Sequence, residues 1–138
     1  MQPTELDANL RRAFERWNRG DYSVHEHEVD PNIEIVSAFG GIEERTYRGH
    51  DGLRRWVQDV TEAFDEWTLH IHEIEHLAPD RALVVGAVHF RGRGSGLTVD
   101  LPCAWLMEHD EGRLRRFEAF PNRVDEARAA ARDASSTS

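Results

Sequence analysis

Histidines and carboxylates are the residues of this sequence whose types and spacing could do chemistry. His70 and His72 stand two residues apart in a segment with strand character. Alternate residues of a strand share a face, so this pair could bind one metal ion, with Glu73, Glu75 or His89 as a third ligand. Spacing fixes no third ligand, and a polar, solvent-facing strand explains the histidines without a metal. We therefore predict no metal and no other cofactor, and keep His70 and His72 as the alternative.

Asp100 is the carboxylate that strand alternation places on one face with Pro102 and Ala104. Burial in such apolar surroundings would raise its pKa and allow it to serve as an acid or a base. The alternative is that Asp100 lies at the start of its strand, at the rim, and is solvated, because an aspartate is rarely fully buried without a partner. Asp100 is therefore a candidate catalytic residue with two open interpretations.

Composition excludes several classes of protein. The chain has 138 residues and a formal net charge of −9, and its 17 basic residues are all arginines, scattered along the sequence. Binding to a nucleic acid needs clustered positive charge, so no nucleic acid partner is expected. No apolar segment approaches the ~18 residues of a membrane span. The first residues also lack the apolar core of a signal peptide, so we expect a cytoplasmic protein without membrane contact.

The elements that must position these residues are mainly helices first and strands afterwards, which is typical of an α+β fold. Apolar residues at spacings of three and four predict helices over residues 4–19 and 51–65, with a short helix over 22–29 between them. The predicted strands cover residues 33–39, 67–77, 81–91, 97–108 and 113–120, followed by a helix over 122–132. Residues 42–48 are expected to be an irregular loop. We predict one domain over residues 1–134 and a frayed tail over 135–138.

Strand alternation and the helix stripes enclose a mostly apolar set of side chains. A cavity lined in this way would suit a small hydrophobic molecule, whereas large side chains that fill the interior would leave no room for one. The predicted ligand-binding residues are Phe14, Trp17, Val36, Trp56, Val60, Phe64, Val88, Phe90, Ala104, Leu106, Phe117 and Ala119.

Three short segments, residues 17–21, 47–53 and 110–114, together resemble a known superfamily. They read WNRGD, YRGHDGL and DEGRL, and their order and spacing resemble the nuclear transport factor 2-like (NTF2-like) superfamily. Within it, the chain is similar to the SnoaL-like group, which includes polyketide cyclases and ketosteroid isomerases. The resemblance implies a cone-shaped α+β barrel, with three N-terminal helices packed on a curved, mainly antiparallel sheet.

The resemblance also implies pairing of two copies, because members of this superfamily usually associate sheet to sheet. The outer sheet face would carry Cys103, Trp105 and Met107. An exposed apolar face of this kind marks an interface. We therefore expect a homodimer with Trp105 at its centre.

The family's usual catalytic residues have no counterparts here. By alignment on the shared segments, the tyrosine and the protonated aspartate of the isomerases fall on Ala13 and Ala104, and their base falls on Val36. The acid–base aspartate of the cyclases falls on Ala119. Its neighbour Glu118 is the candidate displaced acid or base, although strand alternation turns it away from the cavity unless a bulge intervenes.

These observations lead to three hypotheses of function. The first is a SnoaL-like protein of unassigned activity that binds a small hydrophobic molecule. The second is an isomerase or cyclase that acts on a polyketide- or steroid-like substrate, with Asp100 or Glu118 as the displaced catalytic group. The third is a non-catalytic, dimeric association module, which a self-filled interior would favour.

Overall fold

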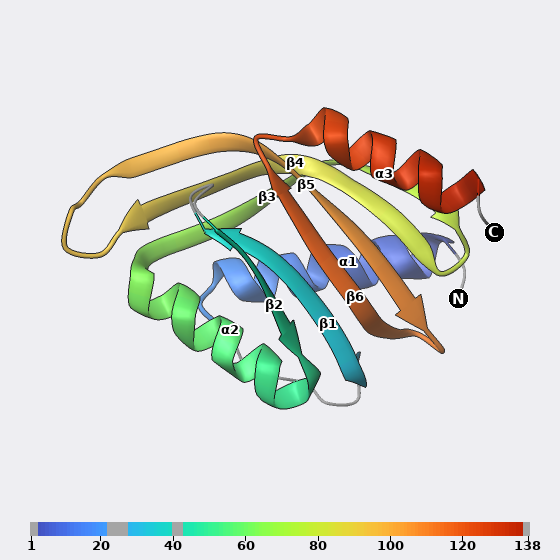
Figure 1. The fold of residues 1–138 in the computed structure, drawn as a ribbon, viewed down its shortest axis with the longest axis horizontal. Helices are drawn as coiled ribbons and strands as arrows, with labels where there is room; N and C mark the ends of the chain where they lie inside the picture. The colour runs from blue at the N-terminus through green and yellow to red at the C-terminus, as the bar shows by residue number, and fades with distance from the viewer. Residues whose placement is uncertain (1–2, 22–27, 40–42, 137–138) are drawn as a thin grey trace.

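A computed structural model describes residues 3–21, 28–39 and 43–136 of the chain. Within these residues the elements follow in a clear order (Figure 1). They are α1 (Pro3–Asn18), β1 (Val29–Phe39), β2 (Glu43–Arg48), α2 (Gly49–Ala63), β3 (Phe64–Ala78), β4 (Arg81–Gly92), β5 (Thr98–Asp110), β6 (Arg113–Pro121) and α3 (Val124–Ser136). No described helix is long and apolar enough to cross a membrane.

The six strands form one sheet in the order β2-β1-β6-β5-β4-β3. β1 runs parallel to β6, and every other neighbouring pair is antiparallel. The predicted α+β class and the mainly antiparallel sheet are therefore confirmed. The predicted barrel is wrong, because the described strands form an open sheet with β2 and β3 at its edges.

We expected three N-terminal helices, but the three described helices do not all lie at the N-terminus. α1 and α2 do so, whereas α3 follows the last strand. Figure 1 shows α1 behind the sheet and α3 across its opposite side. The predicted short helix over 22–29 falls mostly on residues 22–27, which lie outside the described part of the chain.

The main hydrophobic core lies between α1, α2 and one face of the sheet, which we call the inner face. Amphipathic spacing explains why α1 buries Leu6, Leu10 and Phe14 there. α2 does the same with Trp56 and Val60. A smaller core lies on the outer face, where α3 packs against β3 to β6.

The two faces of β5 are the reverse of what we predicted. Cys103, Trp105 and Met107 belong to the main core, and their exposed fractions are 2%, 3% and 3%. Ala104 and Leu106 pack on the outer face in the smaller core, under α3. The physical reason is that helices cover both faces of β5, so its sequence is apolar at every position from Leu101 to Met107 and alternation alone cannot tell the faces apart there.

The burial of Cys103 also sets its chemistry. Its thiol lies in the main core, and burial raises its pKa to about 12. A thiolate is the reactive form of cysteine, so this side chain behaves as a small apolar group at neutral pH. Cys103 is therefore a free, buried thiol, and it is not part of the exposed outer face that the sequence had suggested.

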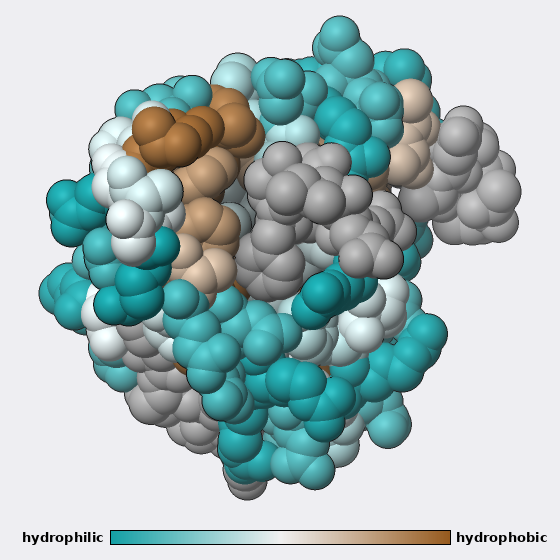
Figure 2. Space-filling view, turned by 60° about the vertical axis from the view of Figure 1, so that its left-hand side comes forward, coloured by the Kyte–Doolittle hydropathy of each residue, from teal (hydrophilic) through white to brown (hydrophobic). Residues whose placement is uncertain are grey.

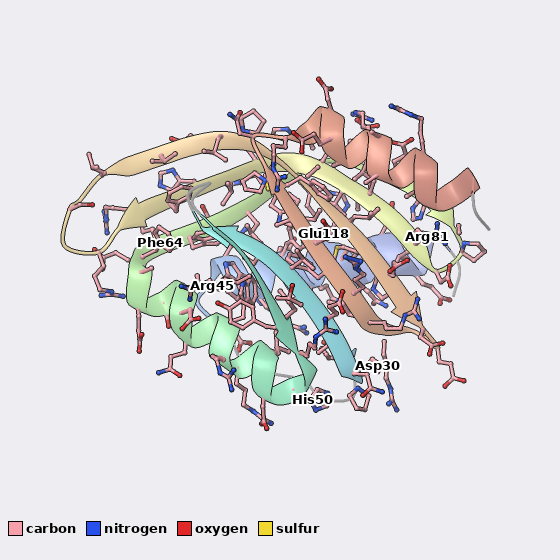
Figure 3. The ribbon with its side chains drawn as sticks, viewed as in Figure 1. Asp30, Arg45, His50, Phe64, Arg81 and Glu118 are labelled. Atoms are coloured by element: carbon pink, nitrogen blue, oxygen red, sulfur yellow. The ribbon has the colours of Figure 1, made fainter. Side chains whose placement is uncertain are left out.

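Several element boundaries differ from the prediction, and two of the differences change the type of element. Residues 43–48, expected to be a loop, form the edge strand β2, which pairs with β1 from Glu34↔Arg48 to Phe39↔Glu43. Phe64, expected on the stripe of the second long helix, is the first residue of β3 (Figure 3). Its spacing of four from Val60 suits a helix, but its backbone is extended at φ −133° and ψ 138°.

Polar side chains cover most of the surface seen in Figure 2, with a hydrophobic patch at the end of the molecule that carries the β4–β5 hairpin. Leu97 directly precedes β5 in this hairpin. Among the described residues it is the large apolar side chain with high exposure, at 70%. The rest of the apolar surface is spread over half-buried positions.

Candidate ligand-binding cavity

A cavity of about 170 Å³ lies between α1, α2 and the inner face of the sheet. We call it the aromatic chamber. Four aromatic side chains line it: Phe14, Trp17, Trp56 and Phe117. Most of its remaining wall is apolar, from α2, β1, β3, β5 and β6, and includes Leu53, Val57, Ile35, Leu69, Met107 and Leu114.

Trp56 is the central side chain of the aromatic wall. Its ring stacks on Trp17 with centroids 5.1 Å apart and an interplanar angle of 29°. It also contacts Phe117, tilted at 57° with a centroid distance of 5.8 Å. Aromatic pairs at such distances favour fixed, offset geometries, so this wall presents flat surfaces to whatever enters the chamber.

The indole nitrogen of Trp56 is buried and has no hydrogen-bond partner in the described part of the chain. By contrast, Nε1 of Trp17 donates to the carbonyl oxygen of Trp67 at 2.9 Å. A buried N–H without an acceptor is unfavourable, because it has lost water and gained nothing in return. A ligand oxygen in the chamber is one way to satisfy it.

Asn18 fixes the end of α1 against the edge strand β3, and so fixes Trp17 beside it. Its side-chain amide donates to the carbonyl oxygen of Leu69, and its side-chain oxygen accepts from the Leu69 N–H, both at 2.8 Å. This pairing imitates a neighbouring strand. It satisfies backbone groups of β3 that would otherwise be an open sheet edge.

Charged side chains stand beside the apolar wall. Arg16 donates to Glu28 at 2.7 Å, and both side chains line the aromatic chamber, as does Asp21. The exposed fractions of the Arg16 and Glu28 side chains are 28% and 44%, so the pair is partly solvated and its net stabilising effect is small. These three residues are the polar part of an otherwise apolar site.

A second cavity of about 190 Å³ adjoins the first, and we call it the polar chamber. The two share part of their walls, including Ala13, Arg16, Glu28 and Met107. The polar chamber adds Asn9 and Arg12 from α1, and His109 from β5.

His109 is the buried titratable group of this second chamber. Its exposed fraction is 9%, and Nδ1 has no hydrogen-bond partner in the described part of the chain. Burial lowers the pKa of the imidazole, and the negative charge of Asp80 offsets this in part. His109 is therefore neutral at pH 7.

The sequence-predicted ligand-binding residues divide into three groups. Phe14, Trp17, Trp56 and Phe117 line the aromatic chamber together. Others lie in or against the main core without lining it: Val60, Phe64, Val88, Phe90 and Ala119.

The third group lies on the other side of the sheet. Ala104 and Leu106 pack under α3, as described above. Val36 is buried, but its neighbour Ile35 is the one that faces the inner core, so alternation turns Val36 to the outer face. For these three, the predicted placement in the cavity is wrong.

Both candidate catalytic carboxylates lie away from the chambers. Asp100 has a side chain 73% exposed, and its oxygen lies 2.6 Å from Nδ1 of His89 on the neighbouring strand. Glu118 pairs in register with Leu106 on the outer face, where it accepts from Arg116 at 3.0 Å (Figure 3). The solvated interpretation of Asp100 and the outward orientation of Glu118 match these positions.

His70 and His72 are both exposed on β3, on either side of Ile71. A register shift between Ile71 and Glu73 interrupts the alternation there. Over residues 3–21, 28–39 and 43–136, no cluster of three or more potential ligands that could hold a metal ion occurs.

Sequence reasoning missed several residues of the two chambers. Met107 was assigned to the wrong face, and His109 was assigned to a turn rather than to the end of β5. Arg12 and Arg16 were not singled out, although Arg12 directly precedes Ala13 and Arg16 lies two residues after Phe14. A helical wheel that extended the Phe14 and Trp17 stripe by one position would have found Arg16.

The sequence comparison agrees with the fold. The sequence pattern of the SnoaL-like domain matches residues 10–117. The chain therefore belongs to the SnoaL-like domain family and has the NTF2-like fold, as the sequence resemblance predicted. No curated protein matches the chain.

Solved structures share this fold. An NTF2-like protein of unknown function from Burkholderia pseudomallei is 20% identical, with a TM-score of 0.71 over 86% of this chain and 92% of its own. A candidate SnoaL-like polyketide cyclase from Jannaschia is 16% identical, with a TM-score of 0.73 over 95% and 96%. SalBIII, an epoxide hydrolase/cyclase-like enzyme of pyran ring formation in salinomycin, is 17% identical, with a TM-score of 0.71 over 91% and 97%. These likenesses establish the fold alone. They do not show the activity, because one fold hosts many activities.

Proposed function

We propose that this SnoaL-like protein binds a small, flat, hydrophobic molecule in the aromatic chamber. The observation that carries the proposal is Trp56, whose ring forms the stacked wall of a cavity of about 170 Å³ while its buried N–H has no described partner. Ligand sites are typically apolar cavities with a few placed polar groups, and this chamber has that composition. The preferred ligand is an aromatic or fused-ring molecule with an oxygen that accepts from Trp56.

The test uses a flat neutral ketone, 2-acetonaphthone, titrated into the protein by calorimetry. We expect one saturable site per chain with a Kd of about 10⁻⁵ M, a usual value for a ligand of this size. Ala13→Phe places a ring in the chamber wall and should abolish binding. Ala129→Phe, the same change on α3 on the opposite side of the sheet, is the matched control and should leave binding intact.

Trp56→Phe separates the ring from its N–H. It should weaken binding of the ketone several-fold more than binding of the hydrocarbon 2-ethylnaphthalene, because both ligands lose contact with the larger ring but only the ketone loses a hydrogen bond. No saturable binding of either compound to the wild-type chain, or equal binding after Ala13→Phe, would rule the proposal out.

The second candidate function is an isomerase or cyclase acting on a polyketide- or steroid-like substrate. One observation favours it: two carboxylates, Asp21 and Glu28, line the aromatic chamber and could move a proton to or from a bound substrate. Structural relatives described as cyclases are consistent with it. Loss of turnover of a candidate substrate in Asp21→Asn or Glu28→Gln, with ligand binding retained, would support this activity, and unchanged turnover in both would refute it.

A further inference from the structure

The polar chamber adjoins the aromatic chamber and is built differently. Its wall includes Asn9, Arg12 and His109, which do not line the aromatic chamber. A molecule held by the tryptophans would have its far end beside these polar groups, because the two chambers meet at Ala13 and Met107. The residues of the polar chamber therefore indicate which chemical group the far end of the ligand carries.

The charge in the polar chamber is biased toward positive. Arg12 and Arg16 both line it, with Glu28 as its carboxylate. Glu28 is engaged by Arg16 at 2.7 Å. The side chain of Arg12 donates to the amide oxygen of Asn9, and no ion pair of Arg12 occurs in the described part of the chain. Arg12 is exposed, as are other described arginines that form no ion pair, and what distinguishes it is its place in the wall of the polar chamber.

His109 supplies a second polar group that lacks a described partner. It is buried, and its Nδ1 has no hydrogen bond within residues 3–21, 28–39 and 43–136. A metal ion would be repelled by the two neighbouring arginines, so a cation is a poor occupant. An oxygen anion suits the set, because arginine and imidazole N–H groups both donate to it.

We propose that the ligand of this protein carries a carboxylate, which the polar chamber binds through Arg12 and His109 while its apolar body lies against Trp56. This inference rests on the proposed function, since it names the polar end of the same ligand. Arg12, which forms no ion pair with a described carboxylate, matches the single charge of a ligand carboxylate. A phosphate dianion would face Glu28 with too few cations to balance it.

The test compares 2-naphthylacetic acid with its methyl ester by calorimetry at pH 7, where the acid is ionised. The acid should bind about tenfold more tightly than the ester, as expected for charge-assisted hydrogen bonds. Arg12→Gln should remove most of this preference, because it should weaken binding of the acid far more than binding of the ester. Arg11→Gln is the matched control, since Arg11 is an exposed neighbour on α1 that lines neither chamber.

His109→Gln provides a second, independent variant. It should reduce the acid preference, because it should weaken binding of the acid more than binding of the ester. Equal binding of acid and ester to the wild-type chain would overturn the inference while the proposed function stands. Failure of both compounds to bind would overturn the inference together with the proposed function. An acid preference that survives Arg12→Gln and His109→Gln would also overturn it, because the carboxylate would then be held elsewhere.

Discussion

At the scale of single residues, Asp100 was predicted to be a catalytic group, but it forms an interaction with His89 at the surface. The hydrogen bond that His89 donates to Asp100 is the largest cause that raises the pKa of His89, followed by the one that it donates to Glu66. Nδ1 of His89 lies 2.6 Å from Asp100 and Nε2 lies 3.2 Å from Glu66, so both ring nitrogens face carboxylates. The imidazolium is the form that can donate to both at once.

This arrangement gives a prediction with a definite sign. Because the folded pKa of His89 is raised, its stabilising effect is complete below the unfolded pKa of about 6.5 and disappears as pH rises through the folded value. Asp100→Asn should lower the pKa of His89 toward 6.5, measured by NMR titration of the ring. The loss of unfolding free energy should be larger at about pH 6 than at about pH 9.

Asp110→Asn, an exposed aspartate on the same strand, is the control and should leave the pKa of His89 unchanged. An unaltered His89 titration in Asp100→Asn would show that the contact is not formed in solution.

Residue positions were predictable where one face of an element is polar, and not elsewhere. The stripe on α1 correctly placed Phe14 and Trp17 in the cavity wall. β5 gave no such signal, because Trp105 packs against Phe14 on one face while Ala104 lies under α3 on the other. Side-chain size held the missing information: a helix packed close to the sheet needs small residues there, and α3 supplies alanines to match Ala104.

At the scale of elements, the contact between β3 and β4 depends on a glycine. A Cβ on Gly86 would lie 1.8 Å from the backbone carbonyl oxygen of His70. The register of the two strands shifts just beyond this point, between Ile71 and Glu73. Backbone cannot give way as a flexible side chain can, so only glycine allows this approach.

Gly86→Ala should therefore lower the free energy of unfolding by at least about 2 kcal/mol, measured by urea denaturation. Ala87→Gly, on the next residue of the same strand, is the control and should cost about 1 kcal/mol or less. A Gly86→Ala protein within about 0.5 kcal/mol of the wild type would show that the two strands can separate there without penalty.

Element boundaries were harder to predict than element types. β2 was missed because Tyr47 is its buried side chain, whereas Arg45, Thr46 and Arg48 are exposed. Such a strand shows little hydrophobic pattern and is defined by its pairing with β1, a contact between segments that sequence periodicity does not report. The cavity is harder still, because it depends on how far α1 and α2 stand from the sheet.

At the scale of the whole molecule, the homodimer remains a prediction, but its expected interface must change. Trp105 is 3% exposed within one chain, so Trp105→Arg would disrupt the core and would not report on association. Figure 1 shows α3 lying away from β1 and β2, so the outer face of these two strands, next to β6, is the part of the sheet that α3 leaves uncovered. There Glu34 lies 3.6 Å from Arg116, which also contacts Glu118 at 3.0 Å.

We expect a homodimer through this outer face, detectable by sedimentation velocity at micromolar concentration. Glu118→Arg should shift the protein to monomer, because it places a second positive charge beside Arg116 in both copies and breaks the alternation of charge across the interface. Glu62→Arg, on the exposed surface of α2, should leave the dimer intact. A wild-type chain that sediments as a monomer would remove the dimer from consideration. If the Glu118→Arg protein is still a dimer, the interface lies on another face. Because the two chambers lie on the inner side of the sheet, either result leaves the ligand-binding proposal unaffected.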